Sequence, residues 1–387
     1  MNKSELKITI IGAGIGGLTA AIALIQSGFT VKIYEKADEL KDPLTCVTLF
    51  PNAMRILSHF GIADEIISKG RAVEMFTLST NKGKEIRTIN FSEEEFKPVS
   101  ILREYLYTIL LSKLPEGTVN FGHTLRDYEI FDDQVNIVFT NEVQLKSDLL
   151  IGADGIYSKV RSLMLKEDEP IYQGYQVWRG IIDSPFNDII EKGSMQFWGR
   201  GKRFGFTRID DTKIAWWAAS KESIHRVNHM NSDRKKKIYK YFRSWAYPVP
   251  ELIKATDENT ILKVGSFAKS PPKNLTEEFV TIIGEAAHSL TPNFGLGVSL
   301  AVEDAIILAR CLDKYHTVPD ALLYYEDARI VRVALITEQV IDFIRMGHFK
   351  KSLSLIWRNI FVRFTPQKTI EKKLRNIFDY DAVKEKI

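Results

Sequence analysis

The sequence is poor in cysteine, with only Cys46 and Cys311 among 387 residues. Two cysteines cannot form a disulfide framework or a cysteine-rich zinc site, so we expect a reducing compartment and assign the protein to the cytoplasm. The seven histidines lack the spacing of metal ligands, and we expect no metal. A G-x-S-x-G segment is also missing, which argues against a serine hydrolase.

Long hydrophobic runs are missing as well. No stretch reaches 18 uninterrupted apolar residues, and the first apolar run is broken by Gly12 and Gly14. We therefore expect no transmembrane segment and no signal peptide. The net charge is only +4, although residues 350–387 carry ten basic residues against four acidic ones. Because no basic stripe crosses the chain and no nucleic-acid-binding module is recognisable, we expect no nucleic acid partner.

The remaining composition, 45% hydrophobic and 26% charged, is that of a folded protein with two to three domains. Strand 7–11, helix 16–27 and strand 31–34 form a βαβ unit, with Gly28 where the helix should end. Residues 170–270 instead show aromatic-rich strands at hairpin spacing. We expect further strands and helices at 73–78, 104–114, 135–139, 148–151, 175–182, 195–198, 204–209, 213–219, 279–283 and 298–312.

A glycine fingerprint follows the first strand. Gly12, Gly14 and Gly17 match G-x-G-x-x-G, with Ile15 and Gly16 inside the motif. Gly12 permits a tight turn, Gly14 lets a pyrophosphate approach the backbone, and Gly17 lets the helix pack on the strand. Glu35, followed by Lys36, ends the second strand, and its carboxylate would accept hydrogen bonds from ribose hydroxyls. This pattern predicts a dinucleotide site but does not distinguish FAD from NAD(P).

Two later segments repeat the order of strand, acidic residue and helix. The strand at 148–151 leads into Asp154-Gly155, where Asp154 read alone is a possible helix cap. The strand at 279–283 leads into Gly284-Glu285 and a loop in which Pro292, Gly295 and Gly297 precede a helix. Such a loop suits close approach of the backbone to a flat or anionic group.

In this order, the motifs resemble those of FAD-dependent monooxygenases of the single-component aromatic-hydroxylase type. That family includes salicylate, urate and hydroxybenzoate hydroxylases and the tetracycline-inactivating monooxygenase. The resemblance covers nearly the whole chain. Besides the segments above, it rests on Phe50-Pro51-Asn52-Ala53, Leu102-Arg103-x-x-Leu106, Trp178-Arg179-Gly180 and Phe378-Asp379-Tyr380-Asp381.

The resemblance implies an α/β fold, in which a Rossmann-like FAD-binding domain carries an inserted antiparallel β-sheet substrate domain and a C-terminal helical segment. We expect a discontinuous FAD-binding domain at 1–72, 98–170 and 272–330, a sheet-rich substrate domain at 73–97 and 171–271, and C-terminal helices at 331–387. The two parts would enclose a dry substrate pocket.

The same resemblance assigns roles to single residues. The fingerprint glycines would hold the FAD pyrophosphate, Glu35 the adenosine ribose, and Arg103 the phosphate side of the flavin. Glu285 stands where the family has an aspartate that binds the ribitol, and Asp154 would lie between the FAD and NADPH sites. The cofactor-binding residues it implies are Gly12, Gly14, Ile15, Gly16, Gly17, Glu35, Lys36, Cys46, Val47, Arg103, Asp154, Glu285, Pro292, Gly295, Gly297 and Val298.

Three positions depart from the family pattern. Thr45-Cys46-Val47 replaces Ala-Gly-Ile beside the flavin, Glu285 replaces aspartate, and the loop 295–299 ends in Ser299 instead of asparagine. Cys46 either limits movement of the flavin or is a small residue that is simply tolerated.

By resemblance, the protein is a flavoprotein monooxygenase with non-covalent FAD, NADPH or NADH as transient reductant and O2 as co-substrate. It would insert one oxygen atom into an aromatic or polycyclic organic small molecule through a flavin hydroperoxide. The alternatives are a halogenase or reductase on the same fold, or a catalytically weak flavin-binding protein. The halogenase motif Trp-x-Trp-x-Ile-Pro is absent. We expect a monomer or homodimer.

Two features remain open. Arg179, on an aromatic strand, is either an ion-pair partner or a contact to substrate or NADPH. The aromatic residues around it are expected to be mostly core. The C-terminal segment alternates apolar and basic residues at helical spacing, so it either packs on the protein or a second subunit, which we favour, or makes peripheral membrane contact. Its apolar residues include Phe343, Ile344, Leu353, Leu355, Ile356, Ile360, Phe361 and Phe364, and its basic residues Lys350, Lys351, Arg358 and Arg363.

Overall fold

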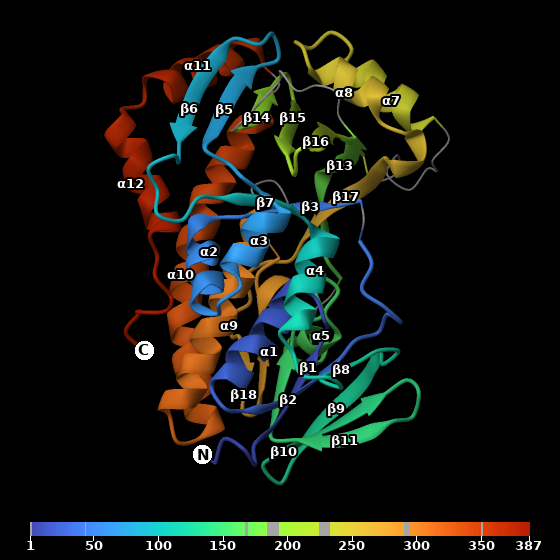
Figure 1. Cartoon of the computed structure of the whole chain (residues 1–387), viewed down its shortest axis with the longest axis vertical. Helices are drawn as coiled ribbons and strands as arrows, with labels where there is room; N and C mark the ends of the chain where they lie inside the picture. The colour runs from blue at the N-terminus through green and yellow to red at the C-terminus, as the bar shows by residue number, and fades with distance from the viewer. Residues whose placement is uncertain are drawn as a thin grey trace.

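The computed structural model describes residues 2–42, 44–166, 169–183, 193–223, 233–289, 295–349 and 351–387. Figure 1 shows a mostly parallel sheet in the lower half of the molecule and a larger, mostly antiparallel sheet in the upper half. Helix α10 (Val318–Gly347) runs along one side, and its end reaches the upper sheet, where the Phe349 carbonyl accepts a hydrogen bond from Gly201. The expected α/β fold is confirmed.

The lower sheet has six strands, of which five are parallel to one another. Only β18 is antiparallel to its neighbour among these described strands. The spatial order is β18 (Thr276–Glu277), β19 (Val280–Ile282), β12 (Leu149–Gly152), β1 (Lys7–Ile11), β2 (Thr30–Tyr34) and β8 (Val119–Asn120). Because β2 lies on one side of β1 and β12 on the other, β1 is a topological switch point, the place where such sheets bind ligands at the carboxyl ends of their strands.

Helices cover this sheet because their apolar faces need partners. The small apolar residues of α1 (Ile15–Gln26) let it pack closely between the sheet and α9 (Leu296–Lys314), and Gly28 follows the end of α1 with a φ of +90°. The other helices of the lower half are α2 (Pro51–His59), α3 (Ala63–Lys69), α4 (Arg103–Ser112), α5 (Lys159–Leu165) and the short η2 (Gly284–Ala286).

The upper sheet has seven strands, and the buried aromatic residues lie on its middle strands. Its order is β17 (Leu262–Ala268), β13 (Ile171–Asp183), β16 (Lys213–Lys221), β15 (Lys202–Arg208), β14 (Gly193–Trp198), β5 (Met75–Thr80) and β6 (Glu85–Asn90). The aromatic residues of this sheet are mostly core, as expected. Those that are buried are Trp178, Trp198, Phe204, Phe206 and Trp216, and Trp217 is half-buried. Helices α7 (Arg234–Phe242) and α8 (Val249–Ala255) cover one face, with η1 (Glu258–Thr260) after them.

Two small antiparallel sheets complete the fold. One contains β11 (Gln144–Ser147), β10 (Gln134–Phe139) and β9 (Leu125–Phe131), and the other contains β3 (Cys46–Leu49), β7 (Val99–Leu102) and β4 (Arg71–Ala72). The predicted strands and helices all occur, although β5 begins two residues later than expected. The boundary expected at residue 330 falls inside α10, and the division of the chain into domains stays a prediction.

The C-terminal segment forms α11 (Ser352–Phe364) and α12 (Gln367–Phe378). For α12, packing on the protein is confirmed, since Ile377 and Phe378 are buried. For α11, packing of the apolar face on this chain is wrong, because most of its large apolar residues, Trp357 and Phe361 among them, are exposed, whereas Arg358 is buried. The reason is that Arg358 lies over the Trp198 ring of the upper sheet, 5.0 Å from its centre. Packing of that face on a second subunit stays a prediction. The side chains of Phe343, Ile344 and Lys350 lie outside the described part of the chain.

Candidate functional site

The glycine loop lies at the carboxyl end of β1, in the predicted position. Gly12 donates its N–H to the Tyr34 carbonyl at 2.8 Å and has a φ of +103°. It packs so tightly on the segment after β12 that an added Cβ would lie 2.5 Å from the Ala153 oxygen. A Cβ at Gly17 would lie 2.0 Å from the Gly12 oxygen. These two glycines are therefore required by the close packing of strand, loop and helix.

Gly14 differs from Gly12 and Gly17 because a side chain added to it would meet open space within the described part of the protein. An added Cβ would have no described atom within 4 Å, and the same holds for Gly297 in the first turn of α9. Gly14 has a φ of −66°, which any residue adopts. Protein packing therefore does not require glycine here, and an open cradle beside a helix N-terminus fits an anionic group such as a pyrophosphate.

The N-termini of α1 and α9 lie close together. Added Cβ atoms at Gly16 and Gly284 would lie 3.3 and 3.2 Å from the same atom, the Cβ of Ala301 in α9. Gly295 starts α9 with a φ of +72°, and Val298 lies in its first turn. The predicted residue Pro292 lies outside the described residues.

Acidic residues follow three of the parallel strands. Glu35, after β2, is buried and accepts hydrogen bonds from the N–H groups of Ala13 at 2.8 Å and Ala37 at 2.9 Å. Each Glu35 oxygen thus keeps a lone pair for a further donor. Glu285, in η2 after β19, is exposed, and its Oε2 lies 4.0 Å from where a Cβ on Gly155 would be. Lys36 is exposed beside Glu35.

Asp154, after β12, has a structural role. Its carboxylate accepts hydrogen bonds from the Ser158 hydroxyl at 2.5 Å and from the N–H groups of Lys159 and Val160 at 2.7 and 3.2 Å. Burial raises the pKa of Asp154, and these hydrogen bonds oppose the shift. The carboxylate therefore holds the start of α5, the cap that the sequence allowed.

Two arginines, Arg103 and Arg179, lie within electrostatic range of each other. Arg103 begins α4, and its Nη1 lies 3.7 Å from Asp42 Oδ2, while its buried Nε has no hydrogen-bond partner among the described residues. Arg179, on β13, forms no hydrogen bond or ion pair with any described residue. Burial lowers the pKa of Arg179, and the positive charge of Arg103 lowers it further. The charges of Asp42 and Glu285 oppose this shift, so Arg179 lies within electrostatic range of Arg103, Asp42 and Glu285.

Cys46 and Val47 lie on β3, where Cys46 pairs with Leu102 of β7 immediately before Arg103. Burial raises the pKa of the Cys46 thiol to about 12, opposed by a hydrogen bond to Ile101 and by the charge of Arg179. A thiol with such a pKa stays protonated, which argues against a nucleophilic role.

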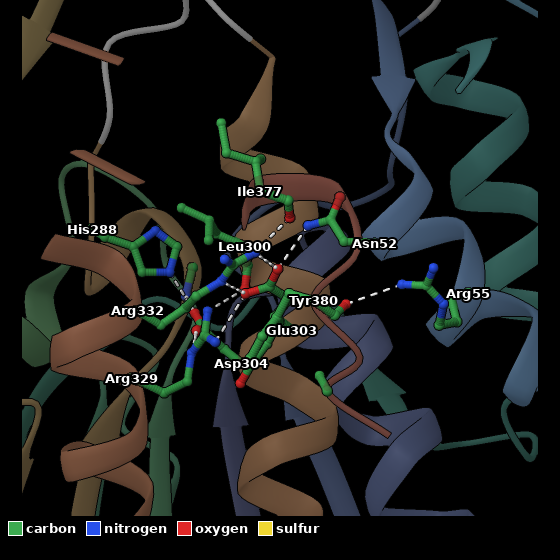
Figure 2. A network of polar contacts seen from close by, with 12 residues as sticks. Asn52, Arg55, His288, Leu300, Glu303, Asp304, Arg329, Arg332, Ile377 and Tyr380 are labelled. Atoms are coloured by element: carbon green, nitrogen blue, oxygen red, sulfur yellow. Dashed lines mark hydrogen bonds and ion pairs between the residues drawn. The ribbon is translucent and has the colours of Figure 1, made fainter. Parts of the chain in front are cut away.

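A buried network of charges supports this site and was not predicted from the sequence. Glu303 and Asp304 are neighbours in α9, and Figure 2 shows both carboxylates facing Arg329 of α10. Arg329 Nε lies 2.6 Å from Asp304 Oδ1 and its Nη1 lies 2.9 Å from Glu303 Oε2. Arg332 binds both Glu303 oxygens, at 3.1 and 2.8 Å, and Asn52 of α2 donates to Glu303 at 2.7 Å.

The second oxygen of Asp304 holds the loop that carries Glu285. It accepts hydrogen bonds from the Gly284 N–H at 2.8 Å and from His288 Nε2 at 2.6 Å. Burial alone would raise the pKa of Asp304, but His288 and Arg329 together with the Gly284 N–H lower it to about 2. The sequence contains a signal for this network that the sequence analysis did not use. Two adjacent acidic residues in an apolar helix require buried cations as partners.

The same network fastens the C-terminal tail. Arg332 donates to the carbonyls of Asn376 and Ile377 at 2.6 and 2.7 Å, and Arg55 of α2 donates to those of Phe378 and Tyr380 at 3.3 and 3.1 Å. Figure 2 shows the contacts to Ile377 and Tyr380. The tail therefore belongs to the structure that supports the Glu285 loop.

The geometry of this site agrees with comparisons to known proteins. A family model described as "FAD binding domain" matches residues 5–340. The chain belongs to this family. Among its relatives, aurachin C monooxygenase/isomerase of Stigmatella aurantiaca is 29% identical over 98% of this chain and 96% of the relative. The FAD-dependent urate hydroxylase of Klebsiella pneumoniae is 29% identical over 85% of this chain and 87% of its own length.

A solved structure of Klebsiella pneumoniae HpxO with FAD and uric acid covers 97% of both chains at 25% identity, with a TM-score of 0.86. These relatives are FAD-dependent monooxygenases, and this chain is a member of the same group of oxidoreductases. The resemblance inferred from the motifs is confirmed, and so is the expectation of a flavoprotein. The role of each single residue stays a prediction.

Proposed function

We propose that the protein is an NAD(P)H-consuming, FAD-dependent monooxygenase that inserts one oxygen atom of O2 into an aromatic or polycyclic organic small molecule. The observation that carries the proposal is that the glycine loop, Glu35 and Glu285 all follow strands of one parallel sheet at its carboxyl edge. Arg103, at the start of α4, is the proposed phosphate contact. In the overall reaction, NAD(P)H supplies two electrons, the substrate gains one oxygen atom, and the other leaves as water.

The residues present fit FAD. The open backbone side of Gly14 would receive the pyrophosphate, and the free lone pairs of Glu35 would accept the ribose hydroxyls. The unpartnered Nε of Arg103 is a buried donor that a bound phosphate oxygen would satisfy. Bound FAD supplies the redox and oxygen chemistry, and the protein provides binding, orientation and exclusion of water. The remaining residues proposed to contact FAD are Ile15, Gly16, Lys36, Val47, Pro292, Gly295, Gly297 and Val298.

Arg179 is the proposed contact to the substrate or to NAD(P)H. Its guanidinium lacks a partner among the described residues and lies on the sheet that would form the substrate side. An arginine in such a position favours an anionic or strongly polar acceptor. Relatives act on urate and on aurachin C, as their names state, and we infer a ring system of comparable polarity for this chain. We also propose a monomer or homodimer in the cytoplasm.

The proposal is tested with purified protein loaded with FAD. We expect NADPH or NADH to reduce the flavin under anaerobic conditions, and isotopically labelled O2 to give a singly labelled product from a panel of heteroaromatic acids that includes urate. Arg179→Lys keeps the charge and serves as the matched control for Arg179→Ala. A FAD-loaded protein whose flavin neither nicotinamide reduces would instead support the catalytically weak flavin-binding alternative.

A further inference from the structure

Helix α11 has its apolar face turned away from the protein. Six large apolar side chains are between 42% and 73% exposed, namely Leu353, Ile356, Trp357, Ile360, Phe361 and Phe364. At 100° per residue they fall within one arc of about 140°, so they form a single continuous face. We call this set the α11 face. Exposed apolar patches of this kind mark interaction sites in natural proteins.

The orientation of α11 is fixed by specific contacts on its opposite side. Arg87 of β6 donates to the carbonyls of Val362, Arg363 and Thr365 at 2.9, 2.8 and 2.6 Å, which satisfies the last turn of the helix. Arg358 is only 4% exposed and lies over Trp198, and Val362 packs in the same cluster. The protein therefore buries an arginine and leaves the tryptophan and phenylalanines outside (Figure 1 shows α11 along the outer edge of the upper sheet).

The C-terminal segment that carries this face is strongly basic. Residues 350–378 contain eight lysine and arginine residues and a single acidic one, whereas the whole chain has a net charge of only +4. The basic residues that are exposed on α11, α12 and their flanks are Lys351, Arg363, Lys368, Lys372, Lys373 and Arg375. Apolar and aromatic residues beside clustered cations match the interface of a bilayer that contains anionic lipids.

A second copy of the chain fits this face poorly. A two-fold interface would place the same basic segment opposite itself, and juxtaposed like charges oppose association. A helix of 13 residues is about 20 Å long and offers a few hundred Å², well below the roughly 800 Å² that each partner buries in a stable dimer.

We propose that the α11 face docks the protein onto anionic membranes. The protein lies on the bilayer surface, with Trp357, Phe361 and Phe364 in the headgroup region and the basic side chains against lipid phosphates. No helix within the described ranges is long and apolar enough to cross a bilayer, so docking is peripheral. The inference does not depend on the proposed reaction.

The test is sedimentation of the full-length, FAD-loaded protein with vesicles of phosphatidylcholine alone or with about a third phosphatidylglycerol. We expect binding to the anionic vesicles that weakens as salt is added, because each basic residue near such a surface contributes roughly a fivefold factor. Trp357→Ser with Phe361→Ser should reduce binding at least about tenfold. Lys372→Glu with Lys373→Glu should also reduce it.

The matched control is Phe131→Ser on β9, since Phe131 is 66% exposed and Phe361 is 63% exposed. We expect Phe131→Ser to leave vesicle binding unchanged, and all variants to keep wild-type melting temperature and flavin content. No preference for anionic vesicles would overturn the proposal, as would an equal loss in Phe131→Ser. A dimer in sedimentation analysis that dissociates in the α11 variants, without vesicle binding, would assign the face to a second copy instead.

Discussion

Gly14 offers a substitution that should separate cofactor binding from folding. In Gly14→Ala the new methyl group meets no described protein atom within 4 Å, and the φ of −66° suits alanine. Alanine lowers the entropy of the unfolded chain but is a poorer residue than glycine at a helix N-cap. We therefore expect the free energy of unfolding of the apoprotein to stay within about 1 kcal/mol of wild type.

FAD binding should respond strongly to the same change. The methyl group would occupy the space through which the pyrophosphate approaches the N-terminus of α1. If two hydrogen bonds between backbone N–H groups and the anionic phosphates are lost, at about 1.5–3 kcal/mol each, binding weakens by about 3–6 kcal/mol. This corresponds to a rise in Kd of roughly a hundredfold to ten-thousandfold.

Titration of the apoprotein with FAD, followed by flavin fluorescence, measures the Kd for FAD. Thermal melting of the apoprotein measures the stability of the fold. Gly117→Ala is the matched control, because it also adds a methyl group in open space, but in a loop with a φ of +72°. It should lower stability by about 1 kcal/mol and leave the Kd unchanged. Gly17→Ala should impair folding, since its Cβ would lie 2.0 Å from the Gly12 oxygen. Wild-type FAD affinity in Gly14→Ala would refute the assignment of the pyrophosphate site.

Two further predictions concern buried ionisable groups. Because the pKa of Asp304 is lowered to about 2, its contribution to stability is complete above about pH 4 and is lost as the pH falls through 2. We expect Asp304→Asn to lower the free energy of unfolding by about 3–5 kcal/mol near neutral pH and to flatten the acid part of the stability profile. Urea unfolding at a series of pH values measures both effects. Burial raises the pKa of the Cys46 and Cys311 thiols to about 12. Both thiols should therefore react with a disulfide reagent near pH 8 at least about tenfold more slowly in native than in unfolded protein. Rapid modification of the native protein would contradict this prediction.

The site on the parallel sheet could be predicted from the sequence because its signals are local. Each strand is a short run of mostly apolar residues, and each is followed within a few residues by glycine or an acid, as at Gly12 and Glu35. Parallel strands share one carboxyl edge, so sequence neighbours of different strands must meet there. The position of Arg179 could not be derived in this way, because it depends on how the upper sheet lies against the lower one.

The buried charge network around Glu303 and Asp304 could not be predicted, because its members are far apart in the sequence. Asn52 and Glu303 are 251 positions apart, and Arg329 lies 25 positions beyond Asp304, so no motif of fixed spacing contains them. Periodicity predicts that the 298–312 helix is buried but does not identify the partner of an acid inside it. The adjacent Glu303 and Asp304 require cations, and only the fold shows that α10 provides them.

The orientation of α11 shows a further limit of sequence patterns. Amphipathic spacing identifies a helix with two faces, and the usual assumption is that the apolar face packs inward. Here Arg87 and Arg358 decide the outcome, because one binds the carbonyls of the last turn and the other lies over Trp198. Both contacts join the helix to strands far away in the sequence. An arginine on an amphipathic helix can thus be the residue that anchors it, and the apolar face is then left for a partner outside the protein.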